Sequence, residues 1–310
     1  MASAILHIKD SYYFDVPKTW WQYRYTSLEQ VPEFLREAHP HATPADFDEA
    51  LSGKILIPQP FGTLKNLYEK QSGFAISRFM VLEVVVAVIL AALFIRLANR
   101  MRTTIVPKGR LWHFLEGILF YVRDDIAVPA IGHHDADRFV PLLWTMFFFI
   151  LLMNLFGLVP WLGAVTASFA VTLTLAGITF LTVLIGGMAK FGPIGFWFNQ
   201  IPHMDLPWYM AIILKPAIFA IEVLGLFIRH GVLAVRLLAN MMAGHVVLLA
   251  VMGLAFSLEG AKSNNWWLTA TISILGSTAL SCLELFVAVL QAYVFTFLSA
   301  LFIGAAVHRH

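Results

Sequence analysis

Long apolar stretches, separated by short charged segments, constrain the fold of this chain more than any other feature of its sequence. Several of them reach the ~18–20 residues that a helix needs to cross a bilayer. Only 13% of the residues are charged, which is about half the fraction typical of a soluble domain. We therefore expect an all-α polytopic membrane protein, embedded in the lipid bilayer, with about five membrane-embedded helical segments.

The placement of basic residues predicts a topology. The first span is expected over Met80–Leu97, the second over 139–159 and the third over 164–187. Because cytoplasmic loops are enriched in Lys and Arg, the loop after the first span is expected in the cytoplasm, the N-terminus outside and the C-terminus inside. The basic residues after the first span are Arg96, Arg100, Arg102, Lys108 and Arg110, and those before it are Lys70 and Arg78.

Residues 111–125 (LWHFLEGILFYVRDD) carry apolar side chains at helical spacing with charges between them. The segment is too short and too charged to span a membrane. We expect an amphipathic helix on the cytoplasmic surface.

The first part of the chain differs from the rest. Residues 1–76 are polar, aromatic and proline-containing, and we expect an N-terminal extramembrane segment there and a membrane domain over 77–310. Two alternatives stay open for the segment: its aromatic residues lie at the lipid interface, or it forms a small packed domain. Its start resembles neither a cleaved signal peptide nor a transit peptide.

The last third consists of two overlong helical stretches, over 209–257 and 266–307. At 1.5 Å per residue each is roughly 60–75 Å long, about twice the hydrocarbon thickness of a bilayer. We expect them to be bent or strongly tilted and to form a hairpin through the hydrophilic link Glu259–Asn265, which the expected topology places on the outer side of the membrane.

Four ionisable residues recur every seven positions in the first of these stretches: Lys215, Glu222, Arg229 and Arg236. Seven residues are nearly two helical turns, so all four lie near one stripe that drifts by ~20° per step. Asn240 lies one turn beyond Arg236, near the same stripe. A charge inside a membrane helix indicates a functional site. Static salt bridges or snorkelling ends are the alternative for Lys215 and Arg229, but Gly231–Ala255 contains no carboxylate that could pair with Arg236.

His245 and Glu284 stand on the two long stretches. Glu284 is the only charge between Trp266 and Val307, and Gln291 shares its face. A His–Glu pair between antiparallel helices suits a proton relay, because burial and mutual charge move both pKa values toward the working pH. The alternative is a static pair that fastens the helices. Asn154, in the second span, lines an aqueous entry or forms an ordinary interhelical hydrogen bond.

The loop IGHHDADRF brings His133, His134, Asp135 and Asp137 close together, but their spacing matches no specific zinc pattern. We expect a solvated loop with no metal. We also expect no cofactor and no nucleic-acid partner.

Three segments carry a resemblance to a known family, subunit a of the F-type ATP synthase. They are Val235–His245, which resembles the RL-x-AN-x-x-AGH signature; Glu284 with Gln291–Phe295, which resembles the last helix; and Asn154–Pro160, which resembles the NLxGLxP end of the second span. Glu222 stands where the family often has a carboxylate. The resemblance covers about residues 80–307 and leaves the N-terminal segment out.

The resemblance implies a function and partners. Arg236 would face the carboxylates of a c-subunit ring and block a direct proton leak. An outer half-channel would be lined by His245, Glu284, Asn240, Gln291 and Asn154, and Glu222 would lie near an inner one. The chain would be the non-catalytic proton-channel stator of an ATP synthase, beside a b-subunit peripheral stalk and indirectly coupled to the catalytic head. Some family members carry the acidic residue and the histidine at swapped positions.

Other functions stay open at this point. A sodium-translocating version of the same subunit is the main alternative. A stand-alone secondary transporter is disfavoured, because we find no inverted repeats or paired broken helices, and an intramembrane hydrolase lacks a nucleophile at suggestive spacing. We expect a multi-pass protein of the bacterial plasma (cell inner) membrane, with the mitochondrial inner membrane as the alternative.

Overall fold

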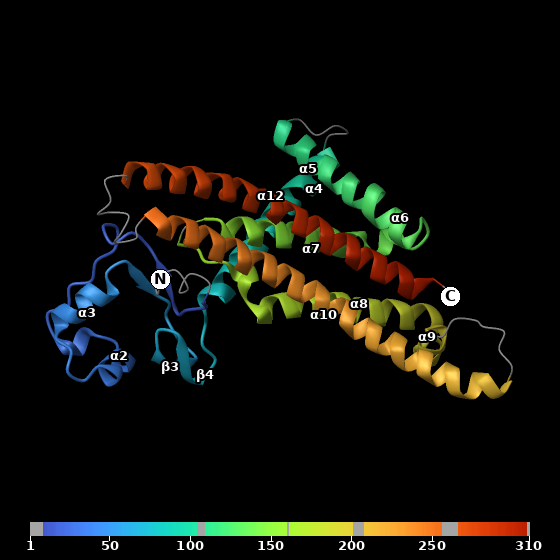
Figure 1. Ribbon diagram of the computed structural model, residues 1–310, viewed down its shortest axis with the longest axis horizontal. Coiled ribbons are helices and arrows are strands. Elements are labelled where there is room, and N and C mark those ends of the chain that lie inside the picture. The colour runs from blue at the N-terminus through green and yellow to red at the C-terminus, as the bar shows by residue number, and fades with distance from the viewer. Residues whose placement is uncertain (1–8, 104–108, 160, 201–207, 256–265, 309–310) are drawn as a thin grey trace. The chain divides into compact units, whose positions relative to one another are not determined.

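The structure is a computed structural model that describes residues 9–103, 109–159, 161–200, 208–255 and 266–308 (Figure 1). Several expectations lie outside the described residues. They concern Lys108, Pro160, the link Glu259–Asn265 and the last two residues of the chain.

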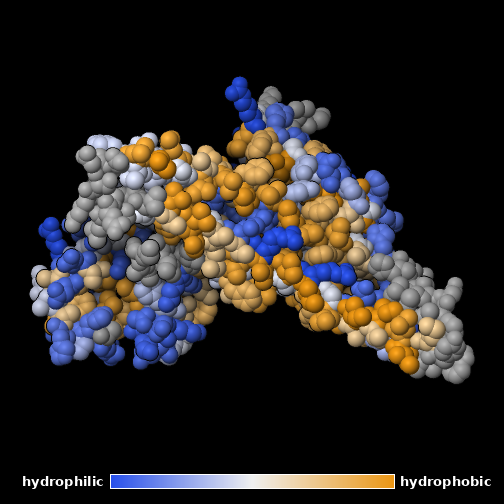
Figure 2. Space-filling model, in the orientation of Figure 1, coloured by the Kyte–Doolittle hydropathy of each residue, from blue (hydrophilic) through white to orange (hydrophobic). Residues whose placement is uncertain are grey.

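Five of the described helices are long and apolar enough to cross a membrane, which confirms the all-α polytopic class. They are α4 (Arg78–Thr103), α7 (Ala136–Gly157), α8 (Phe169–Phe191), α10 (Trp208–Ala255) and α12 (Trp266–Val307). α10 and α12 are the overlong pair, with 48 and 42 residues. Figure 2 shows hydrophobic side chains over the surface of the long helices, as contact with lipid requires.

The third span begins five residues later than expected, at Phe169 instead of residue 164. Gly163 has a φ of +87°, a conformation that does not continue a helix. A short 3-10 helix, η3 (Val165–Ala167), then precedes α8. After α8, Gly192 and a proline at the first position start the short helix α9 (Pro193–Asn199).

The chain divides into two compact units. The first comprises Met1–Ile89, Met153–Ser168 and Gly244–Glu284, and the second comprises Leu90–Leu152, Phe169–Ala243 and Leu285–His310. Four of the five long helices contribute residues to both units.

In the first unit, the end of α10 packs against the start of α12. The Ser273 hydroxyl donates to the carbonyl of Val251 at 2.5 Å, and His245 contacts Glu284. The later residue of α10, Val251, contacts the earlier residue of α12, Ser273, and the earlier residue of α10, His245, contacts the later one, Glu284. The two helices are therefore antiparallel, as the predicted hairpin requires.

In the second unit, the expected surface helix consists of three consecutive pieces. α5 (Arg110–Phe120) continues into the π-helix η2 (Tyr121–Ala127) and then into α6 (Val128–Ile131). The indole of Trp144 donates to the carbonyl of Leu119 at 2.9 Å, so α5 lies against α7. Gly304 allows the backbone of α12 to approach Ala130 of α6 closely, since a Cβ there would collide with the Ala130 carbonyl.

The N-terminal segment is folded as a small domain with its own apolar core. Strands β1 (Tyr13–Asp15) and β2 (Lys54–Leu56) pair antiparallel, as do β3 (Gly62–Asn66) and β4 (Glu69–Gly73). The helices are η1 (Leu28–Gln30), α2 (Glu33–Ala38) and α3 (Pro44–Leu51). Its core consists of Val31, Leu35, Phe47 and Leu51. Figure 2 shows a mostly hydrophilic surface over this segment.

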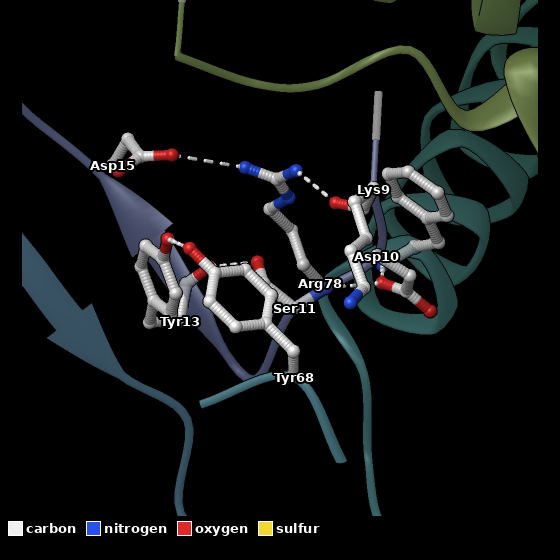
Figure 3. A network of polar contacts seen from close by, with 8 residues as sticks. Lys9, Asp10, Ser11, Tyr13, Asp15, Tyr68 and Arg78 are labelled. Carbon is white, nitrogen blue, oxygen red and sulfur yellow. Dashed lines mark hydrogen bonds and ion pairs between the residues drawn. The ribbon is translucent and has the colours of Figure 1, made fainter. Parts of the chain in front are cut away.

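A fully buried arginine at the start of α4 holds this segment in place (Figure 3). The Arg78 guanidinium lies 3.2 Å from Oδ2 of Asp15 and donates to the carbonyl of Lys9 at 3.1 Å, while its backbone N–H donates to the Ser11 carbonyl at 2.8 Å. Asp10 accepts from the first-turn N–H of Phe79 at 3.2 Å. Burial raises the pKa of the Asp15 carboxyl, and the Arg78 charge opposes that shift.

Candidate functional site

The charged stripe of α10 contains one internal ion pair. A guanidinium nitrogen of Arg229 lies 3.0 Å from Oε2 of Glu222, and both side chains are partly exposed. The seven-residue spacing places the two residues on one face, where their long side chains reach each other. Arg229 therefore forms a salt bridge, which is the alternative given for it above. Lys215 is exposed and forms no ion pair with a described residue.

Arg236 differs from Arg229 in its surroundings. It is half-buried, between the fully buried residues Leu233, Ala234 and Leu237 of the same helix. Within the part of the chain that the structure describes, its guanidinium forms no hydrogen bond or ion pair. Because an unpaired charge in a membrane helix is costly, this arrangement suits a negatively charged partner from another molecule.

His245 and Glu284 form a buried pair across the hairpin of the first unit. Nδ1 of His245 lies 2.6 Å from Oε1 of Glu284, and the two side chains are 8% and 9% exposed. Nδ1 donates if the carboxylate is ionised, and it accepts if the carboxyl carries the proton. One proton shared over a short distance between two titratable groups is the chemistry that a relay needs.

The close approach of this pair depends on Gly244. A Cβ at residue 244 would lie 2.6 Å from Oε1 of Glu284 and 3.0 Å from its carboxyl carbon. A glycine next to His245 therefore leaves the space that the carboxylate occupies. Steric contact with Glu284 thus explains the glycine that precedes the histidine in the signature.

The remaining predicted residues are divided between the units. Asn154 is buried in the first unit, with His245 and Glu284. Glu222, Arg236, Asn240 and Gln291 belong to the second. Gln291 is buried and Asn240 half-buried, and neither forms a hydrogen bond with a described residue.

Asp135, just before α7, and Asp137, in the first turn of α7, each form an ion pair with a basic residue. Asp135 forms an ion pair with Lys190, which holds the pKa of its carboxyl below the usual value. Asp137 accepts from Nε of Arg123 at 3.0 Å. Among the described residues no three His, Cys, Asp or Glu side chains gather as metal ligands would.

The seven-residue stripe does not include one further ionisable residue of α10, His230. The same rule on ionisable residues in membrane helices nevertheless selects it. The residue is 5% exposed, and its ring packs against Phe180 of α8 and Phe302 of α12, with centroid distances of 5.3 and 5.0 Å. Nδ1 donates to the Leu226 carbonyl at 2.8 Å, and Nε2 is buried without a hydrogen-bond partner among the described residues.

A cavity of about 160 Å³ lies beside this histidine, between α8, α10 and α12. Its polar lining residues are Glu222, Arg229 and Gln200. Leu226 and Phe302, which both contact His230, form part of its wall.

Comparisons with known proteins show which family the chain resembles. The family model described as ATP synthase A chain matches residues 80–304. The chain is similar to the ATP synthase subunit a of Myxococcus xanthus (strain DK1622), with 39% identity over 76% of this chain and 75% of that protein. It is similar to the same subunit of Chloroherpeton thalassium (strain ATCC 35110 / GB-78), with 38% identity over 80% and 72%. For Anaeromyxobacter sp. (strain Fw109-5) the identity is 43% over 67% of this chain, which spans about half, 49%, of that relative.

Proposed function

Since this chain belongs to the ATP synthase A chain family, we propose that it is the proton-translocating stator subunit of an F-type ATP synthase. Protons pass through two half-channels to and from the carboxylates of a c-subunit ring, and the resulting rotation drives ATP synthesis. The chain itself performs no chemistry on ATP.

The unpaired Arg236 is the observation that carries this proposal. Its charge lies in a membrane helix, and no described residue neutralises it. A ring carboxylate at the same depth is the partner that this position suits. A fixed positive charge also repels protons, so it separates the two half-channels and forces protons to travel on the ring.

His245 and Glu284 form the titratable centre of the proposed outer half-channel. Their 2.6 Å contact lets a proton move between them without an intervening water. Asn154, Asn240 and Gln291 supply further polar groups to that half-channel, and Glu222 stands at the inner one. The membrane potential supplies ~2.3 kcal/mol per charge per 100 mV to protons that follow this route.

The proposed partners are the c-subunit ring, the b-subunit peripheral stalk and, indirectly, the catalytic head. The proposed location is a bacterial inner membrane, with the N-terminal domain outside and the C-terminus in the cytoplasm. The basic residues Arg96, Arg100 and Arg102 at the end of α4 support this orientation.

Proton uptake by inverted membrane vesicles tests the proposal. Vesicles from cells that lack this chain should hydrolyse ATP without acidifying, and reintroduction of the chain should restore ATP-driven acidification that a protonophore abolishes. The restored chain should co-purify with ring and stalk subunits. Acidification without this chain, or purification of the chain alone as an active transporter, would refute the assignment. Acidification that sodium suppresses would instead identify the sodium-translocating version.

A further inference from the structure

We propose that His230 carries protons on the cytoplasmic side of the proposed pathway, between the cavity beside Glu222 and the membrane level of Arg236. This inference rests on the proposed function and adds a residue that the seven-residue stripe does not include. It begins from the buried, unpaired Nε2 of His230.

The tautomer of His230 follows from its one hydrogen bond. A carbonyl only accepts, so the 2.8 Å contact with Leu226 requires a proton on Nδ1. In the neutral ring, Nε2 is then a lone-pair acceptor. A buried acceptor without a partner calls for an explanation, and the uptake of a proton there supplies one.

Phe180, Phe302 and Leu226 form a cage around the ring, and none of these described neighbours is titratable. Phe180 and Phe302 contribute only aromatic surface. Among the described residues, no titratable side chain stands between 172 and 188 on α8 or between 294 and 307 on α12, and the charged residues before His230 on α10 are Lys215, Glu222 and Arg229.

Access to water comes from the cavity next to the cage. Its volume of about 160 Å³ exceeds the ~30 Å³ that one water takes up in the liquid, and Glu222, Arg229 and Gln200 provide the polar partners that water needs. Leu226 and Phe302 belong both to the wall of the cavity and to the surroundings of His230. The His230 ring is therefore adjacent to the wall of the cavity.

Two further polar groups, the hydroxyls of Thr179 and Ser299, lie deeper in the membrane than His230. The hydroxyls of Thr179 on α8 and Ser299 on α12 are buried and 3.3 Å apart. Thr179 precedes Phe180, and Ser299 lies one turn before Phe302. Both hydroxyls donate to carbonyls of their own helices, so each oxygen keeps its lone pairs for accepting a hydrogen bond.

These groups define one proton-transfer step. Nε2 binds a proton from a water in the cavity, which gives an imidazolium and leaves a hydroxide that the bulk neutralises. Nε2 then returns the proton to a water at the level of Thr179 and Ser299, and the neutral ring is restored. His230 lies six residues, or about 9 Å along the axis, before Arg236.

The test compares His230→Phe with wild type in inverted vesicles that contain the complete complex. ATP-driven proton uptake is measured over external pH values from about 6 to 9, a range that spans imidazole titration. We expect roughly hundredfold slower uptake with His230→Phe, together with loss of the pH-dependent component that wild type shows. His230→Gln, which keeps a donor for the Leu226 carbonyl but does not titrate, should behave in the same way.

Phe180→Leu is the matched control, because it alters the same cage and keeps the imidazole. It should retain the wild-type pH profile. The proposal is overturned if His230→Phe pumps within twofold of wild type with an unchanged profile, or if it and Phe180→Leu slow uptake equally at every pH. If the complex fails to assemble with either His230 variant, the residue has a packing role and the proposal is overturned as well. Arg236→Ala in the same assay separates the two ideas: lost pumping there with normal pumping in His230→Phe rejects only the role of His230.

Discussion

Nδ1 of His245 lies 2.6 Å from Oε1 of Glu284, although 39 positions separate the two residues in the chain. The contact joins the end of α10 to the start of α12 within one compact unit. Both side chains are buried, and they contact each other directly. The pair combines a structural role, as a link between two antiparallel helices, with the proposed role in proton transfer.

Exchange of the two residues separates these roles. His245→Gln and Glu284→Gln should each slow ATP-driven proton uptake about tenfold or more, because each removes one titratable partner. The double exchange His245→Glu with Glu284→His restores the couple in the opposite order and should recover most of the uptake. Proton uptake in vesicles with equal amounts of assembled complex measures this. Normal uptake in either single variant would contradict the relay.

Gly244→Ala should disturb the same pair without touching either titratable group. The new methyl group would lie 2.6 Å from Oε1 of Glu284, so the carboxylate must move away from His245. We expect uptake to fall severalfold. Gly253→Ala on the same helix is the control, because a Cβ there meets no atom within 4 Å. Equal uptake in the two variants would show that the 2.6 Å contact is not needed.

Loss of the buried guanidinium should destabilise the N-terminal domain. Arg78→Ala leaves Asp15 and the Lys9 carbonyl without their donor, and removal of one partner of a buried pair typically costs about 3–5 kcal/mol. Gly163→Ala should act in the same direction, since its Cβ would lie 2.9 Å from the Arg78 guanidinium carbon.

Thermal unfolding of the purified complex, monitored through the protease sensitivity of residues 9–76, measures this effect. Arg24→Ala changes an exposed arginine and should leave the midpoint unchanged. A midpoint for Arg78→Ala that equals that of Arg24→Ala would show that the network in Figure 3 contributes nothing to stability.

Cysteine labelling tests the orientation. With Cys282→Ser as background, Ser27→Cys places a thiol at an exposed position of the N-terminal domain, and His134→Cys places one in the loop before α7. A membrane-impermeant maleimide should label the first in intact cells stripped of their outer membrane and the second only in inverted vesicles. The reverse pattern would overturn the orientation proposed from the basic residues after α4.

The membrane spans were predictable because their signal is local. Length and hydropathy alone locate α4, α7, α8, α10 and α12, and the bounds differ from those expected by a few residues, most clearly where Gly163 adopts a positive φ. The antiparallel hairpin followed from two adjacent overlong helices.

Features that depend on long-range packing were not predictable. The N-terminal core joins Val31 and Leu35 to Phe47 and Leu51 across a loop, and no periodicity in the sequence marks it. The ion pair of Arg78 with Asp15 joins residues 63 positions apart. His230 was missed for another reason: the seven-residue stripe drew attention to one face of α10, and the burial of His230 depends on α8 and α12.

The most direct test of the account is ATP-driven proton uptake by inverted vesicles that carry Arg236→Ala, with ATP hydrolysis by the detached catalytic head as the control. Arg236 has no hydrogen-bond or ion-pair partner among the described residues, so its removal should leave assembly intact while it abolishes uptake. The account predicts no acidification and normal hydrolysis by the head. Acidification that persists with Arg236→Ala would contradict the ring-facing arginine and, with it, the rotary proton pathway.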